Sequence, residues 1–165
     1  SHLDGQIEYN TVRPYTYTYD DIPISYTHYN QPLAHPLGAN FRELIGKIRY
    51  QPIHPLTLQA RVVYADFGTD NPGENVGHNL FANYLDRTTP EGSDDDESGH
   101  QTGQGVSNQL LIGQLTASYQ LRHNVYIDAD YIYRNRASED PALEYTRNYV
   151  GLSLRVNIAA NTVDY

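Results

Sequence analysis

The sequence predicts an all-β protein, in which six long strands form part of a larger antiparallel, up-and-down transmembrane β-barrel. Three observations lead to this fold class. Apolar and polar residues alternate with a period of two along most of the chain, which is typical of strands with a different environment on each face. Long and short connections follow one another in strict turn, and tyrosines gather near the ends of the apolar faces, as in barrels of the outer membrane.

Six segments carry this alternation, and each is expected to form one strand. They are residues 3–10, 43–50, 57–67, 113–121, 125–134 and 149–158. From Val150 to Ile158, every even position is aliphatic and every odd position is glycine or polar. With roughly 8–13 residues each, the segments exceed the average strand of about 5–6 residues. They match the about 9–11 residues with which a tilted strand crosses a bilayer.

The expected connections alternate in length. The long ones span about residues 13–39, 68–105 and 137–146, and the short ones span 51–55 and 122–124. If the first strand runs outward, every long connection lies at the outer end, as in outer-membrane barrels. Closed barrels have about 8 strands or more, so residues 1–165 are interpreted as part of one larger barrel domain, and the aromatic last residue, Tyr165, favours its C-terminal portion. Completion by partner chains and an open, soluble sheet are the alternatives.

The two faces of the expected strands differ in kind. The apolar face carries tyrosines in two belts, which are typical of the two membrane interfaces: Tyr9, Tyr64, Tyr131 and Tyr133 near the outer ends, and Tyr50 and Tyr119 near the inner ends. The opposite face carries charges suited to a wet lumen, namely Lys47, Arg49, Arg61, Asp128, Asp130, Arg134 and Arg155. Unpaired charges are too costly for a dry core. They would also suit the exposed side of a soluble sheet whose apolar face is covered.

Composition narrows the function classes. With no cysteine among 165 residues, the chain has neither disulfides nor thiolate metal sites. The formal net charge of −9 argues against nucleic acid as a partner, because phosphate backbones require a basic surface. No apolar run approaches the about 20 residues of a membrane-spanning helix. The missing methionine, even at position 1, is interpreted as the sign of a processed chain or a fragment. No cofactor is expected.

The first long connection holds the candidate ligand-binding residues. Its prolines restrict the backbone, so we expect a structured loop, folded over or into the lumen. Flat aromatic rings beside hydrogen-bonding side chains favour sugars as ligands, and the candidates are Tyr15, Tyr17, Tyr26, His28, Tyr29 and His35. His28 and His35 are zinc ligands in one interpretation. In the favoured one they satisfy backbone groups of the loop.

Catalysis is not expected. Asp128 and Asp130 lie one strand repeat apart on the same face, at about 7 Å, a separation within the range of glycoside hydrolases. Ion pairs with lumen arginines explain them more simply, and the candidates are Arg61, Arg134 and Arg155. The sequence contains no nucleophile elbow and no phosphate loop. The acidic segment 91–98 lacks the spacing of a calcium loop, and its role stays open.

Three motifs resemble a known family. "RPYTYT" (residues 13–18), "HYNQPLAHPLGANF" (28–41) and, more weakly, "YVGLSLRVN" (149–157) resemble segments of Bacteroidetes outer-membrane barrels in the capsule-assembly Wzi superfamily, which includes a gliding-motility protein. The resemblance covers about a third of the chain by motif and the rest by pattern. It implies a barrel considerably larger than this chain, and it carries over no specific ligand residues.

The same resemblance implies a role and a location. It implies non-catalytic assembly or retention of capsule or surface polysaccharide in the cell outer membrane. Outer-membrane lipid, surface polysaccharide and other subunits of an envelope complex are the expected partners. Two other functions fit the strand pattern. One is a porin-like channel or transporter barrel, and the other is a soluble β-sandwich that binds carbohydrate.

Overall fold

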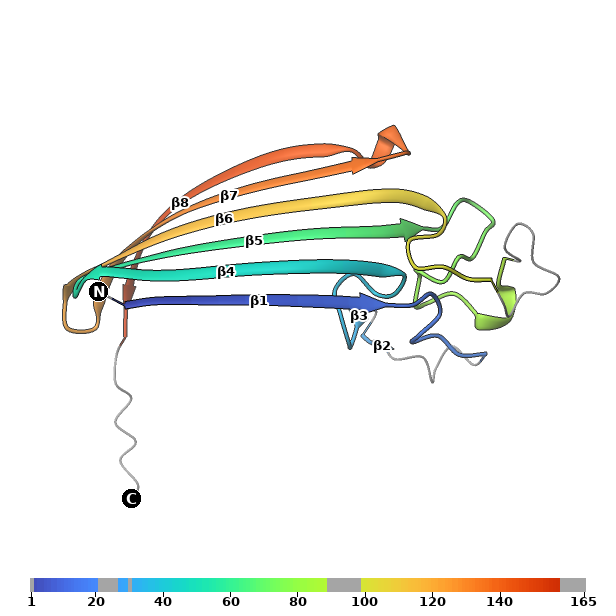
Figure 1. Ribbon diagram of the computed structural model, residues 1–165, viewed down its shortest axis with the longest axis horizontal. Helices are drawn as coiled ribbons and strands as arrows, with labels where there is room; N and C mark the ends of the chain where they lie inside the picture. The colour runs from blue at the N-terminus through green and yellow to red at the C-terminus, as the bar shows by residue number, and fades with distance from the viewer. Residues whose placement is uncertain (1, 21–26, 30, 89–98, 158–165) are drawn as a thin grey trace, which may run out of the picture.

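The chain forms a single six-stranded antiparallel sheet in a computed structural model that describes residues 2–20, 27–29, 31–88 and 99–157 (Figure 1). Its strands are β1 (His2–Val12), β4 (Phe41–Ile53), β5 (Leu56–Thr69), β6 (Val106–Arg122), β7 (Val125–Ser138) and β8 (Tyr145–Val156). Shorter elements are the two-residue strands β2 (Thr27–His28) and β3 (Gln31–Pro32) and the 3-10 helices η2 (Tyr84–Asp86) and η3 (Pro141–Leu143). The all-β prediction is confirmed.

All six predicted strands are present, and each extends beyond its predicted bounds at one or both ends. The last predicted residue, Ile158, lies outside the described part of the chain. Within the described residues, no helix has the length and apolar character needed to cross a membrane.

Strands that follow one another along the chain are neighbours in the sheet, in the order β1-β4-β5-β6-β7-β8. Consequently the three long connections lie together at one end of the sheet, on the right in Figure 1, and two tight turns lie at the other end. The tight turns are centred on His54–Pro55 and His123–Asn124. Asn124 adopts φ 62°, a left-handed conformation that asparagine tolerates better than most residues. The predicted alternation of long and short connections is therefore confirmed.

The strand register aligns the apolar positions of neighbouring strands on one face of the sheet and the polar positions on the other. Val62 on β5 lies opposite Gly46 on β4 and Gly113 on β6. One residue earlier, Arg61 lies opposite Lys47 and Gln114. Because every register shift of one residue would exchange the faces, this pairing keeps aliphatic residues on one side and polar residues on the other.

The apolar face is uncovered along the whole sheet. Ile7 on β1 is 83% exposed, Val62 on β5 is 49% exposed, and Leu152 on β8 is 79% exposed. No second sheet and no long helix of the described chain lies over these residues (Figure 1). A water-soluble sheet normally buries its apolar face and exposes its polar face. Here the apolar face is the exposed one.

The small buried core lies on the opposite, polar face, at the end where the long connections gather. Phe41, Ala65, Phe67 and Leu110 form this core. Val63, which breaks the alternation of β5, belongs to the same face and is only 4% exposed. The loops that cover these residues therefore explain the break in the pattern.

The sheet is open. Within the described residues, β1 pairs only with β4 and β8 pairs only with β7. Both edges are long strands whose outer backbone groups have no partner strand, a condition that proteins usually avoid because free edges pair with other chains.

Candidate functional site

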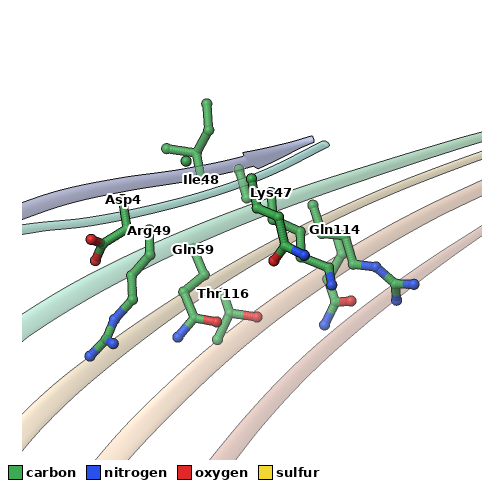
Figure 2. A pocket seen from close by; sticks show the side chains of 11 residues that line it. Asp4, Lys47, Ile48, Arg49, Gln59, Gln114 and Thr116 are labelled. Carbon is green, nitrogen blue, oxygen red and sulfur yellow. The ribbon is translucent and has the colours of Figure 1, made fainter. Parts of the chain in front are cut away.

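The middle of the polar face is hollowed. A cavity of about 560 Å³ lies over β1, β4, β5 and β6, and its polar lining consists of Asp4, Gln6, Lys47, Arg49, Gln59, Arg61, Gln114 and Thr116. Figure 2 shows Lys47, Arg49, Gln59 and Gln114 pointing to the same side of the sheet, whereas Ile48 points to the other. We call this cavity the basic hollow.

The lining of the basic hollow is positively charged, whereas the whole chain is negatively charged. Its lining holds three cations, Lys47, Arg49 and Arg61, and one carboxylate, Asp4, which gives a formal charge of 3 − 1 = +2 against −9 for the chain. Lys47 and Arg61 lie directly opposite one another in register, a placement that destabilises a sheet when the charges are alike. Lys47, Arg49 and Arg61 were all predicted as lumen charges, and the register brings them together.

A second hollow of about 400 Å³ continues toward the tight turns and shares Arg49 and Gln59 with the first. Here Arg155 donates to Asp128 through Nε (2.8 Å to Oδ2) and Nη2 (3.1 Å to Oδ1). Its guanidinium also lies 4.3 Å from the ring centroid of Tyr126. Of the three arginines predicted as partners, Arg155 is the one that forms this ion pair.

Asp130 is engaged separately from Asp128. The hydroxyl of Thr116 donates to Asp130 Oδ1 at 2.6 Å, while Arg134 lies with its guanidinium 5.5 Å from the ring centroid of Tyr145. Within the described residues, Asp128 therefore forms the predicted ion pair, whereas Asp130 is held by a hydroxyl group instead of an arginine.

Glu43, nearer the end where the long connections gather, is tied to the first long connection. Glu43 accepts from Asn10 Nδ2 (3.1 Å) and contacts His35 Nε2 (3.1 Å). The backbone N–H of Leu37 donates to His35 Nδ1 (3.2 Å), so Nε2 carries the proton and donates to Glu43. His35 thus satisfies a backbone group of the loop, as favoured from the sequence, and its ring stacks on Phe41 at 4.4 Å.

Four segments fold together over the end of the polar face where the long connections gather, and we call them the loop cap: residues 13–20, 35–40, 70–88 and 99–105. Its centre is Asn40, which is fully buried. Asn40 Nδ2 donates to the carbonyls of Gly68 (3.1 Å) and Gln104 (2.8 Å), and Oδ1 accepts from the N–H of Gly103 (2.7 Å). One side chain therefore joins two long connections and the end of β5.

Tyr15 anchors the first loop within the cap. It is 7% exposed, its hydroxyl donates to the carbonyl of Asn75, and its ring meets Tyr84 and His100 edge-on. Burial raises the pKa of Tyr15 to about 12, so the phenol stays a neutral donor. Gly77 (φ 83°) passes so close that a Cβ there would lie 2.6 Å from the backbone nitrogen of Tyr15.

The six predicted ligand-binding residues do not form one cluster. Tyr15 and the half-buried Tyr17 belong to the loop cap, and His35 lies where the cap meets the sheet. His28 and Tyr29 lie together on the small β2–β3 hairpin, with ring centroids 4.2 Å apart. Tyr26 and the acidic segment 91–98 lie outside the described residues.

A third hollow, of about 540 Å³, opens in the loop cap beside Tyr15. Its lining also includes the side chains of Arg13, Tyr84, Arg87 and His100. The guanidinium of Arg87 lies 3.9 Å from the ring centroid of Tyr84 and donates to its carbonyl at 3.1 Å. Arg87 and His100 were not predicted, because they come from a distant loop whose position only the folded chain defines.

His78 gives the loop cap a pH dependence. Its Nδ1 donates to the carbonyl of Ala39 (2.9 Å), and its ring stacks on Phe67. Burial lowers the pKa of His78 from its ordinary value of 6.5, with Asp70 opposing and Arg136 adding to this effect. Since the unfolded loop binds the proton more readily, cap stability is complete above about pH 6.5 and falls as the pH drops below that value.

We expect hydrogen exchange of the cap amides, corrected for intrinsic rates, to accelerate below pH 6.5. His78→Phe removes the titrating group and should flatten this dependence, while His28→Phe on the exposed hairpin should leave it unchanged. A pH dependence that persists in His78→Phe would assign the effect to another group.

Among the described residues, no three histidine, aspartate or glutamate side chains gather as metal ligands. The fold and the hollows define an open antiparallel meander with a bare apolar face and a partly capped polar face. Comparisons of this chain with family models, with curated proteins and with solved structures found no match.

Proposed function

We propose that these six strands belong to the wall of a transmembrane β-barrel in the outer membrane, which assembles or retains capsule or other surface polysaccharide without catalysis. The observation that carries the proposal is the bare apolar face. Exposure to water of so many aliphatic side chains is unfavourable by about 25 cal/mol per Å². Lipid tails remove this penalty for every strand at once.

Strand length and the positions of Tyr9, Tyr64, Tyr50 and Tyr119 agree with a lipid-facing wall, whereas Tyr133, predicted near the outer ends, lies in the same row as Val62. The strands have 11 to 17 residues, whereas a tilted strand needs about 9–11 to cross a bilayer. Tyr9 and Tyr64 flank Leu44 in register, and Tyr50 lies opposite Leu58 near the other end. Phenol rings at both ends of an aliphatic band suit the two interfaces of a membrane.

The free edges of β1 and β8 support completion by further strands. Closed outer-membrane barrels contain about 8 or more strands, and closure removes edges that otherwise promote aggregation. The hollowed polar face becomes the lumen wall in such a barrel, where Lys47, Arg61 and the Arg155–Asp128 pair remain hydrated.

A polysaccharide ligand is supported by the hollow in the loop cap. Tyr84 offers a ring face partly covered by Arg87, and Arg13 lies at the same opening. Aromatic and guanidinium groups at an outer surface suit sugar rings and their acidic substituents. The sequence resemblance to capsule-assembly barrels points to the same ligand class and to the envelope partners that it implies.

Fractionation and complementation test the proposal together. We expect the full-length protein to stay in the membrane pellet after alkaline carbonate and to need detergent for extraction. Deleting its gene should reduce cell-attached polysaccharide, and Tyr84→Ala with Arg87→Ala should fail to restore it, while Tyr29→Ala on the hairpin restores it. Extraction by buffer alone would instead support the soluble sandwich.

The hollows along the polar face also suit a porin-like channel, and conductance separates the two functions. Because the loop cap covers the outer end of that face, we expect near-baseline conductance from the intact protein in planar bilayers. A variant with a short Gly-Ser linker between Asp70 and Gly105 should conduct steadily. Steady conductance by the intact protein would favour the channel.

A further inference from the structure

We infer that the basic hollow is an oxyanion-binding site, a conclusion that rests on the proposed barrel because only a closed wall encloses this face. Lys47, Arg49 and Arg61 originate close together on two adjacent strands. Directly opposite residues have Cβ atoms about 4.5–5.5 Å apart, and same-face neighbours along a strand lie about 7 Å apart. These side chains are therefore long enough to approach one ligand from different sides of the hollow (Figure 2).

None of the three cations has a carboxylate partner within the described residues. The two ion pairs of the described chain, His35–Glu43 and Arg155–Asp128, involve none of these three side chains. Asp4 faces Arg49 in register without forming such a pair. An anion placed between Lys47 and Arg61 would relieve their repulsion and accept charge-assisted hydrogen bonds.

Of the carboxylates near the hollow, Asp4 lines it and Asp130 accepts from Thr116 at its edge, while Glu43 and Asp128 are held farther along the face. Glu43 is bound by Asn10 and His35 at the outer end. Asp128 is bound by Arg155 at the inner end. With three cations against the one carboxylate of its lining, the hollow keeps a positive formal charge, and a predominantly positive cleft raises the local concentration of anions.

Three amide side chains, Gln6, Gln59 and Gln114, make the hollow suited to more than a simple ion. Gln59 lies opposite Arg49, and Gln114 lies opposite Arg61, on the same face. Both line the cavity of about 560 Å³, and amides donate to and accept from hydroxyl groups. The shared chemistry of the ligand is thus an oxyanion, supplied either by an acidic sugar or by free phosphate.

Titration of the full-length protein in detergent tests this site with three probes: glucuronate, inorganic phosphate and glucose. We expect binding of one or both anions at low salt, weakening as salt rises, and no binding of glucose. Tighter binding of glucuronate than of phosphate, with a selective loss of glucuronate in Gln59→Ala, would identify an acidic sugar. Equal binding of both anions would identify a general oxyanion site.

Charge-removing variants complete the test. Arg61→Gln and Lys47→Gln should each weaken anion binding by at least tenfold. Arg147→Gln on β8, which removes the same charge outside the hollow, should change it by less than twofold. Absence of anion binding, or equal losses in all three variants, would overturn the inference. Resistance to alkaline carbonate extraction is measured on the same variants. A protein that stays in the membrane pellet but binds no anion contradicts the anion site alone, whereas extraction by buffer contradicts the barrel.

Discussion

Val62→Arg is expected to destabilise the folded protein in a bilayer by about 2–4 kcal/mol, the penalty for a cation near the midplane of a barrel wall. Val62 lies on β5 in the middle of the apolar face and is half-exposed. Its cross-strand neighbours are Gly46 and Gly113, and both have open space where a side chain would project. The arginine therefore meets no steric obstacle, so the effect reports the medium that contacts this face.

Ile132→Arg is the matched control for this prediction. Ile132 lies on β7 in register with Gln114, one residue from the row that contains Val62, and it belongs to the polar face. The change from an aliphatic residue to arginine is the same at both sites, but Ile132 faces the proposed lumen. We expect a change within about 1 kcal/mol there.

Denaturant titration of the full-length protein folded into lipid vesicles measures both values. Equal destabilisation at Val62 and Ile132 would contradict the assignment of lipid and lumen faces. In a soluble sandwich that buries the apolar face, Val62→Arg would instead abolish folding in plain buffer.

The strands were predictable because the alternation is a local property. Each of the six has one continuous aliphatic face, and a period of two admits no other regular structure. Val63, Ile45 and Ile132 are exceptions on the polar face, and burial explains Val63 and Ile45. No local sequence pattern distinguishes an aliphatic residue that a distant loop covers from one that interrupts the alternation and stays exposed.

The basic hollow was predictable only in part. The alternation of side chains along each strand places Lys47, Arg49 and Arg61 on one face, but the distance between them depends on the register of β4 and β5. That register follows from the His54–Pro55 turn and from the irregularity between Tyr50 and Ile53. The Arg155–Asp128 pair depends in the same way on the pairing of β7 with β8, and turn geometry at this level of detail is not encoded in the hydropathy pattern.

The loop cap was the least predictable part. The prolines of residues 13–39 indicated an ordered loop, and the cap confirms that order for the described residues. The bonds from Asn40 to Gly103 and Gln104, however, join positions more than 60 residues apart. The sequence offered only the residue types at 38 and 40, since glycine and asparagine tolerate a left-handed backbone and asparagine commonly hydrogen-bonds the local backbone. In the structure, Gly38 and Asn40 adopt φ 73° and 61°.

Asn40→Ala is expected to destabilise the loop cap by about 3–5 kcal/mol. The substitution leaves the carbonyls of Gly68 and Gln104 and the N–H of Gly103 without their partner, and a buried polar group left unpaired costs about 1–3 kcal/mol. Alanine also tolerates the left-handed backbone poorly, at about 1–2 kcal/mol. The strands themselves should persist, because their ladders do not involve this side chain.

Asn124→Ala separates the two contributions. Asn124 has φ 62°, almost the same as Asn40, but its side chain forms no hydrogen bond within the described residues. This variant should therefore lose only the about 1–2 kcal/mol of backbone strain. Protection of the Gly103 and Gly68 amides against hydrogen exchange reports the cap directly, and it should fall in Asn40→Ala and be retained in Asn124→Ala. If both variants lost the same protection, the three bonds of Asn40 would contribute nothing beyond its conformation, and the loop cap would be held by the packing of Tyr15 and Phe41 instead.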